Sequence, residues 1–399
     1  MKWEKKKLCE CTEYITDGDH QPAPKADKGV HFIKIKDIVN NQVSFDAQVY
    51  VPQEYYDNLP MERKPQKEDV LYTVVGSFGI PSYVQTDELF CFERNIALLH
   101  PNKDIEPRFL YYSLKNPAFY KGVEIVANGS AQKLIPLSKL KDLKILVPDK
   151  EAQRHIADIL SAYDDLIENN QRQIKLLEEA AQRLYKEWFV DFRFPGHENT
   201  KIVDGVPEGW SIYPFSSKVD IMSGGTPKTS IPDYYNGTIP FYTPKDNDGA
   251  FFAYKTQMNI TEGGLKNCNS RLYPPKTVII TARGTVGKTT ILAVPMAMNQ
   301  SCYALKMKEN DAPYYLFFAL NNEIKALQTM ANGGVFNTII GKTFDSINVQ
   351  IPKDPLIYGF EETVRPFMEQ IKNKLQANSK LVEARDRLLP KLMSGEVEV

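Results

Sequence analysis

Apolar side chains recur at alternating steps of four and three residues through one long stretch near the middle of the chain. This spacing is that of a coiled-coil seam, and it predicts a helix over about residues 151–189 that is roughly 57 Å long. A helix of this length exceeds what a domain needs for its own core, so we expect its apolar stripe to face a partner helix. The seam residues are Ile156, Leu160, Tyr163, Ile167, Asn170, Ile174, Leu177, Ala181, Leu184 and Trp188.

A second stripe with the same spacing lies near the C-terminus and is more polar. Pro366 disfavours a helix interior, so we expect the continuous helix to start or kink there. Two long helices with matching stripes in one chain most simply pack on each other. The seam residues here are Phe360, Val364, Phe367, Ile371, Lys374, Asn378, Leu381, Arg385, Leu388 and Leu392.

The sequence contains an internal repeat with a period of about 205 residues. Repeats of about 20–50 residues would indicate a solenoid, but this period is as long as a whole domain. Such a period predicts two domains of one design and an internal pseudo-two-fold axis. A two-fold axis would make the long helices antiparallel and would set Asn170 near Lys374 and Asn378. Two copies of the first half could also pair through their own seams. The repeated segments are 107–116 with 313–322, 73–79 with 281–287, 129–148 with 333–352, and 177–184 with 381–388.

Each half reads as a mixed domain followed by a long helix. Short β-type runs at 70–75, 144–147 and 277–281 are bounded by Gly, Pro, Asn and Asp. The aromatic segment 109–114 and its copy 315–320 predict a core helix in each domain. We therefore expect an α+β fold in which two similar α/β domains are joined by two long antiparallel coiled-coil helices. The expected boundaries are 1–150 for the first domain, 151–194 for the central helix, 195–353 for the second domain and 354–399 for the C-terminal helix.

The charge balance excludes a globally basic nucleic-acid binder, because the net charge of the 399 residues is −1. Any nucleic-acid role must use local patches or the charge of a partner. The N-terminal residues lack an apolar signal region and no long apolar run follows, so we expect a protein that is neither exported nor membrane-bound. An odd count of 5 cysteines suits a reducing cytoplasm.

Motifs for chemistry are incomplete. The segment 282–289 resembles a phosphate-binding loop, but Ala282 replaces its first glycine and a strand-like run follows, so a hairpin turn is the preferred interpretation. Cys9, Cys11, His20 and His31 do not have the spacing of a structural zinc site. The tetrapeptide that amino-methyltransferases use to hold a base is absent, and 116–119 is its nearest approach. The chain is therefore predicted not to be an enzyme and to hold no cofactor or metal.

Polar and basic loop residues are candidates for contacts with DNA, although the same types are common in any loop. Lys, Arg, Gln, Asn and Ser are the side chains that read base edges in a major groove. The candidates are Lys25, Lys36, Ser77, Arg94, Ser130, Gln132, Lys133, Thr226, Lys228, Lys245, Arg283, Lys288 and Asn337.

Together with the repeat, several strings resemble the DNA specificity (S) subunit of type I restriction-modification systems. The start of the first helix has the spacing Pro148, Gln153, Ile156, whereas 354–366 departs from that pattern. The resemblance covers essentially the whole chain. The strings are RNIALLHPN at 94–102, QIKLLEEAAQRLYKEWF at 173–189, SGGTPKT at 223–229, NQSCYAL at 299–305 and KLVEARDRLLPKLMSGE at 380–396.

The resemblance implies two target recognition domains, each reading one half of a split site in the major groove of double-stranded DNA. It implies that the helix pair sets the gap and docks two methyltransferase (M) subunits, which hold S-adenosylmethionine. Restriction (R) subunits, which use ATP and Mg, would be recruited in turn. A coiled-coil scaffold that binds protein, and a nucleotide-using enzyme built on 282–289, are the alternatives from other classes.

Overall fold

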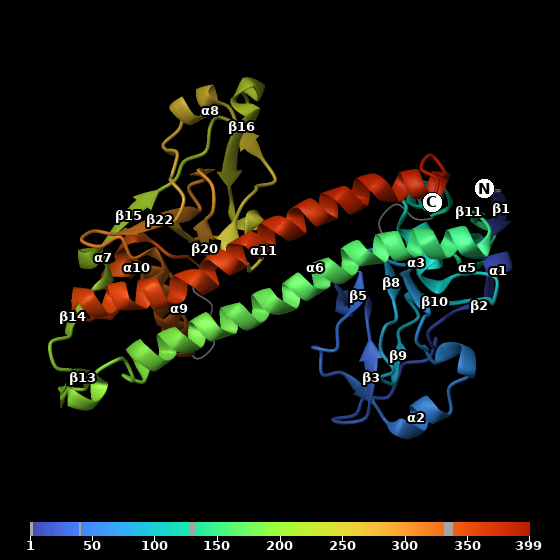
Figure 1. Cartoon of the computed structure of the whole chain (residues 1–399), viewed down its shortest axis with the longest axis horizontal. Coiled ribbons are helices and arrows are strands. Elements are labelled where there is room, and N and C mark those ends of the chain that lie inside the picture. The colour runs from blue at the N-terminus through green and yellow to red at the C-terminus, as the bar shows by residue number, and fades with distance from the viewer. Residues whose placement is uncertain (1–2, 40, 128–132, 331–337) are drawn as a thin grey trace. The chain divides into compact units, whose positions relative to one another are not determined.

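The computed structural model describes residues 3–39, 41–127, 133–330 and 338–399. The chain divides into two compact units: unit 1 comprises Met1–Ile167 and Lys380–Val399, and unit 2 comprises Glu168–Ser379. Each unit therefore contains a mixed α/β domain together with part of each of the two long helices (Figure 1). The predicted boundaries at 150, 194 and 353 separate the helices from the domains, which is a different division of the same chain.

Unit 1 is built on a sheet of order β2-β10-β7-β8 and a second sheet of order β6-β3-β9, in which β3 and β9 are parallel. Strand β7 is buried along its whole length, as expected of a run rich in β-branched and aromatic residues. The strands are β1 (Glu4–Lys7), β2 (Thr12–Asp17), β3 (Val30–Ile33), β4 (Ile38–Val39), β5 (Gln42–Val43), β6 (Tyr50–Val51), β7 (Val70–Thr73), β8 (Pro81–Tyr83), β9 (Phe90–Phe92), β10 (Ile96–Pro101) and β11 (Lys144–Val147). The helices of the domain are α1 (Leu8–Cys11), α2 (Gln53–Asp57), α3 (Pro107–Lys115), α4 (Pro117–Val126) and α5 (Leu137–Asp142), with the 3-10 turns η1 (Ile35–Asp37) and η2 (Met61–Arg63).

Unit 2 repeats the main features of this design, with one more strand in its main sheet. Its main sheet has the order β15-β22-β19-β20-β17, and the sheet β18-β16-β21 again contains a parallel pair, β16 with β21. The strands are β12 (Ile202–Val203), β13 (Val206–Pro207), β14 (Ser211–Pro214), β15 (Val219–Ser223), β16 (Tyr235–Tyr242), β17 (Phe252–Ala253), β18 (Asn259–Ile260), β19 (Val278–Thr281), β20 (Thr289–Leu292), β21 (Ala297–Met298), β22 (Cys302–Met307) and β23 (Asn348–Ile351). The helices are α7 (Phe215–Lys218), α8 (Glu262–Lys266), α9 (Pro313–Met330) and α10 (Gly341–Asp345), with the turns η4 (His197–Asn199), η5 (Pro232–Tyr234) and η6 (Pro244–Asp246). The repeat in the sequence is therefore a repeat in the fold.

The aromatic segments form core helices, as predicted. In α3, Phe109 and Leu110 are 0% exposed, and in α9, Tyr315 and Phe318 are 1% and 3% exposed. These side chains pack between the sheet of each unit and the long helices, because each belongs to one apolar cluster with residues of both.

The long helices are α6 (Lys150–Tyr185), which continues into a π-helical turn, η3 (Lys186–Val190), and α11 (Asp354–Ser394). In unit 1, Leu160 of α6 shares the core with Leu389 near the C-terminal end of α11. In unit 2, the Tyr185 ring at the other end of α6 lies 5.9 Å from the Phe360 ring near the start of α11. Within each unit the two helices therefore run antiparallel.

Helix α11 begins at Asp354, where the C-terminal helix was expected to begin, and continues through Pro366. The expectation that its continuous part starts at this proline is therefore wrong, and a kink there stays a prediction. A proline inside a helix costs about 3 kcal/mol, since it removes one backbone hydrogen bond and crowds the preceding turn. Here Phe360, Val364 and Met368 are all 0% exposed on the same face. The apolar area buried on both sides of Pro366 offsets that local cost.

Candidate nucleic-acid interface

The segment 282–289 is a hairpin turn between β19 and β20, which confirms the preferred interpretation over a phosphate-binding loop. The Thr281 hydroxyl donates to the Thr285 carbonyl and accepts from the Lys288 amide at 3.0 Å. A phosphate-binding loop requires a helix after the turn, whose amides hold the phosphate, whereas here a strand follows. Arg283 and Lys288 are exposed on this turn.

The equivalent turn in unit 1 joins β7 to β8 and is held in the same way. The Thr73 hydroxyl donates to the Ser77 carbonyl at 2.7 Å and accepts from the Ile80 amide at 3.0 Å. Ser77 is exposed at the tip, between glycines whose φ angles are 71° and 83°. Because left-handed backbone favours glycine, Gly76 and Gly79 fix the shape of the turn.

Lys133 lies beside this turn in unit 1. Its ammonium group is 5.3 Å from the centre of the Phe78 ring and 3.9 Å from the Glu124 carboxylate, and its carbonyl accepts from the Gly76 amide at 3.3 Å. The structure therefore brings the candidates Ser77 and Lys133 together. Three other candidates, Ser130, Gln132 and Asn337, lie outside the described residues.

Two further candidates, Lys36 and Lys245, occupy equivalent 3-10 turns. In η1 the Asp37 carboxylate accepts from the Lys34 amide at 2.9 Å, and in η6 the Asp246 carboxylate accepts from the Thr243 amide at 2.8 Å. These bonds fix the turns and leave the two lysines exposed.

In unit 2 the η6 turn lies against the hairpin turn. The Thr285 hydroxyl donates to the Pro244 carbonyl at 3.4 Å, and a side-chain carbon at Gly284 would lie 3.8 Å from the Pro244 ring. Lys245 and Arg283 therefore lie on adjoining turns.

A third pair of equivalent loops begins at Gly18 and at Gly224. A side-chain carbon at Gly18 would lie 2.2 Å from the Phe92 carbonyl oxygen, and one at Gly224 would lie 2.2 Å from the Asn299 carbonyl oxygen. Glycine is therefore required where each loop crosses the turn before β10 or β22. These loops and turns carry the exposed candidates Lys25, Arg94, Thr226 and Lys228.

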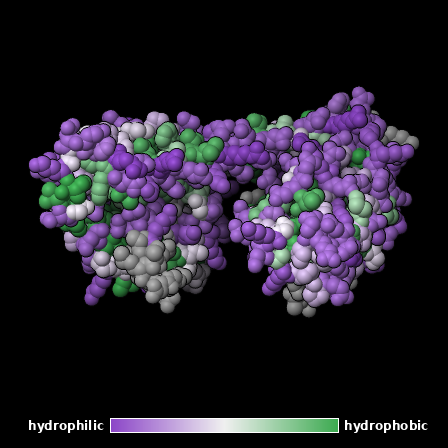
Figure 2. Space-filling view, turned by 90° about the horizontal axis from the view of Figure 1, so that it is seen from below, coloured by the Kyte–Doolittle hydropathy of each residue, from purple (hydrophilic) through white to green (hydrophobic). Residues whose placement is uncertain are grey.

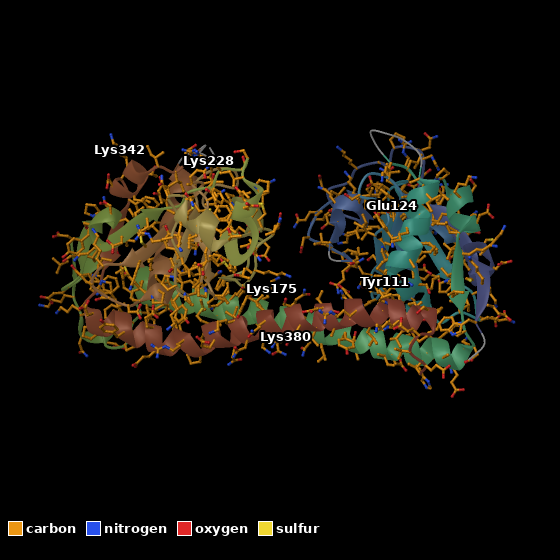
Figure 3. The ribbon with its side chains drawn as sticks, turned by 90° about the horizontal axis from the view of Figure 1, so that it is seen from above. Tyr111, Glu124, Lys175, Lys228, Lys342 and Lys380 are labelled. Atoms are coloured by element: carbon orange, nitrogen blue, oxygen red, sulfur yellow. The ribbon has the colours of Figure 1, made fainter. Side chains whose placement is uncertain are left out.

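The structure places one of these candidates in a polar contact. The Thr226 hydroxyl bonds to the Gln300 side-chain oxygen, and residue 300 is the counterpart of Arg94 in the repeat. Lys228 lies with Lys342 at the edge of unit 2 away from α11 (Figure 3). Lys342 is exposed on the short helix α10 and is not among the candidates, which are loop residues.

The surface suits a polar ligand more than a small apolar one. Figure 2 shows mostly hydrophilic residues on the face of each unit that it presents, with hydrophobic residues in small separate patches. Within the described residues, no group of three His, Cys, Asp or Glu side chains is placed to hold a metal ion.

Burial raises the pKa of the Cys11 thiol to about 11, so this thiol stays protonated. No helix of the described parts is long and apolar enough to cross a membrane.

Comparison with known proteins identifies a family for this chain. A family model described as the type I restriction modification DNA specificity domain matches residues 1–179 and 207–376, once for each copy of the repeat. The type I restriction enzyme MjaIX specificity subunit of Methanocaldococcus jannaschii is 28% identical over 314 residues, which covers 77% of this chain and 72% of the relative. The type I restriction enzyme HindI specificity subunit of Haemophilus influenzae is 25% identical over 438 residues and covers 92% of this chain and 94% of the relative.

The fold is similar to a crystal structure of the type I restriction-modification system S subunit from M. genitalium, with a TM-score of 0.62, 19% identity and coverage of 98% of this chain and 96% of that chain. The curated relatives are specificity subunits, which confirms the prediction that this chain is not itself an enzyme. A model that matches most of the chain, in register with its two repeats, confirms the resemblance seen in the sequence. The chain therefore belongs to the type I restriction modification DNA specificity domain family.

Proposed function

We propose that the domain of each unit reads one half of a bipartite DNA sequence in the major groove. The observation that carries this proposal is that the two units present equivalent exposed turns with different side chains. At the hairpin turns, Arg283 in unit 2 corresponds to Val75 in unit 1, and Thr285 corresponds to Ser77. Since arginine prefers guanine and valine offers no hydrogen bond to a base, such differences would give the two halves different targets.

We also propose that α6 and α11 act as an antiparallel coiled-coil spacer related by a pseudo-two-fold axis. Half-sites read from one face of B-DNA lie about one helical turn, roughly 34 Å, apart. With 36 residues, α6 is about 54 Å long, which is sufficient to span such a separation.

The partners in this proposal are double-stranded DNA, two M subunits docked on the helix pair, and R subunits in the complete complex. This chain needs no cofactor for recognition, and S-adenosylmethionine, ATP and Mg would be held by the partner subunits in the cytoplasm. Because the net charge is −1, much of the attraction to the DNA backbone would come from the M subunits. A protein-binding scaffold, the alternative, would protect no split DNA site.

The equivalent lysines Lys36 and Lys245 provide a paired test. Each is changed to alanine in the complex with M subunits, and the rate of adenine methylation is measured on duplexes altered in one half-site at a time. We expect each variant to weaken methylation by about tenfold, the loss of one polar contact, and to relax selection in its own half-site only. Lys201→Ala, an exposed lysine of the linker before β12, is the control. If both variants relaxed the same half-site, or neither relaxed any, separate reading by the two units would be refuted.

A further inference from the structure

The internal repeat allows each contact of the helix pair to be compared with its counterpart. Leu177 of α6 corresponds to Leu381 of α11, and on the same count Ile167 corresponds to Ile371. Apolar positions are thus largely kept, as a seam requires. Several polar positions differ between the two copies.

Unit 1 contains a polar cluster of Tyr112, Lys115, Asp164 and Arg385. The Arg385 guanidinium bonds to the Asp164 carboxylate, which also accepts from the Tyr112 hydroxyl at 2.8 Å and lies 3.5 Å from the Lys115 ammonium. The side chains of Lys115 and Arg385 are only 14% and 12% exposed. Arg385 also bonds to its neighbour Asp386 at 2.7 Å. The bridge from α6 to α11 is therefore largely removed from water.

The counterpart of this cluster in unit 2 carries no charge. Met368 of α11 stands where Asp164 stands on α6, and Ala181 of α6 stands where Arg385 stands on α11. Both are 0% exposed. Phe318 replaces Tyr112, and Asn321 replaces Lys115. One end of the helix pair is thus joined by an ion pair and the other by apolar packing.

A second unlike pair lies in the middle of the helices. The Asn170 amide donates to the Asn378 side-chain oxygen at 2.8 Å. The counterpart of Asn378 on α6 is Ile174, and the counterpart of Asn170 on α11 is Lys374. Two copies of α6 would therefore set Asn170 against Ile174, and two copies of α11 would set Asn378 against Lys374.

We propose that the Asn170–Asn378 bond and the Asp164–Arg385 bridge make the two helices accept each other and discriminate against a second copy of themselves. A pair of first halves would set Asp164 against Ala181 in place of Arg385. A pair of second halves would set the buried Arg385 against Met368, with Asp386 as its remaining carboxylate. A pair of first halves thus loses both bonds and gains no substitute, since Ile174 and Ala181 carry no polar group. Removing one partner of a buried hydrogen bond or ion pair is strongly destabilising.

This preference would matter during synthesis. The first half of a chain emerges before the second half exists, so first halves of neighbouring nascent chains meet before α11 is made. A seam with only apolar positions would let them pair. The regular stripe of α6 favours a dimer of two first halves. We expect this dimer to be weaker than the native pairing of α6 with α11. The inference is independent of what the domains bind.

The test uses the full chain, cut after it has folded. A protease site is inserted at the tip of the β12–β13 hairpin, between Asp204 and Gly205, where both residues are exposed and nothing lies within 4 Å of a side-chain carbon at Gly205. Two preparations with different tags on the first half are cleaved, mixed and incubated. Native mass spectrometry then counts complexes that contain two first halves.

We expect the unsubstituted halves to remain paired as unlike halves. Asn378→Ile with Arg385→Ala gives α11 the residues of α6 without adding a buried charge, and it should raise the share of first-half pairs at least about tenfold. Ile174→Asn with Ala181→Arg, which gives α6 the residues of α11, should raise it as well. The control Gln376→Ile with Arg387→Ala makes the same types of change at exposed positions of α11 and should not. Random reassortment of the unsubstituted halves, or an equal effect of the control, would overturn the proposal.

Discussion

At the scale of single residues, a buried carboxylate links stability to pH. Glu361 of α11 is 3% exposed and accepts from the Tyr315 amide in the first turn of α9 at 2.8 Å. Burial raises its pKa from 4.5 to about 7, although the bonds from the backbone amides act in the opposite direction. The folded chain therefore holds this proton more tightly than the unfolded chain does.

From this shift we predict that unfolding becomes easier as pH rises. The contribution of Glu361 is fully present below the unfolded pKa of 4.5 and is lost as pH passes through about 7. Glu361→Gln keeps an acceptor for the amide but cannot ionise. Between about pH 5 and pH 8, the unfolding free energy of this variant should therefore fall by roughly 1–3 kcal/mol less than that of the unsubstituted chain. Urea unfolding at several pH values measures this, with the exposed Glu362→Gln as control. An unchanged slope in Glu361→Gln would contradict the assignment.

Asn170 carries a second prediction at this scale. A lone asparagine in an apolar seam usually costs stability, so the sequence by itself favours a stabilising Asn170→Leu. The structure predicts the opposite effect on stability. Asn170→Leu breaks the hydrogen bond to Asn378 and places methyl groups against the side-chain amide of Asn378. The single change should cost about 1–2 kcal/mol, whereas Asn170→Leu with Asn378→Leu should recover most of it. Thermal or urea unfolding of the four forms gives the coupling, and additive effects would show that the bond contributes nothing.

At the scale of elements, the sequence predicts the helices and turns that follow from residue spacing, but few of the side-chain contacts between them. The stripe of α6 and the hairpin turn at 282–289 follow from spacing and from glycine, and both are present. Burial of Phe360 and its neighbours outweighs the local effect of Pro366, so the helix continues where the sequence favoured an interruption. The bridge from Arg385 to Asp164 could not be predicted, since Asp164 is not a seam position and the spacing of a stripe does not show where an adjacent polar side chain turns.

The candidate site divides in the same way. Equivalent turns could be aligned from the repeat, and the structure shows that Lys36 and Lys245 occupy the same turn. Lys342 was not found, because it lies in the short helix α10 and the candidates were sought among loop residues. Contacts to bases depend on how a loop meets DNA, so the individual roles of the candidates stay predictions.

The proposed spacer role of the helix pair can be tested at this scale. Seven residues inserted after Ile167 in α6 and after Ser379 in α11 lengthen both helices by about 10 Å at the point where the units divide. The seam stays in phase, so the unread gap should grow by about three base pairs while the half-sites keep their sequences. Mapping methylated adenines in cells that express the variant with M subunits measures this. Insertion into α6 alone puts the helices out of register and should abolish methylation. A changed half-site with an unchanged gap would show that the helices do not set the spacing.

At the scale of the whole molecule, the question is whether this chain takes part in the methylation reaction itself. The nearest approach to the methyltransferase tetrapeptide is 116–119, at the junction of α3 and α4. There the Asn116 side-chain oxygen accepts from the Ala118 amide at 3.0 Å and caps α4. The Asn116 side-chain oxygen is therefore occupied by a hydrogen bond within the fold, and Ala118 stands where the tetrapeptide has its second proline. This side chain stabilises a helix rather than a base flipped out of DNA.

We therefore predict that the purified chain with S-adenosylmethionine, ATP and Mg transfers no methyl group and cuts no strand. Adding M subunits should start adenine methylation at the bipartite site, and adding R subunits should then allow cleavage. Asn116→Ala, which removes the cap and costs about 1 kcal/mol of stability, should leave the methylation rate of the folded complex unchanged. The measurement is incorporation of labelled methyl groups into duplex DNA, and catalytically inactive M subunits are the control. Methylation by the chain alone, or its loss in a folded Asn116→Ala complex, would mean that this chain takes part in the reaction as well as in recognition.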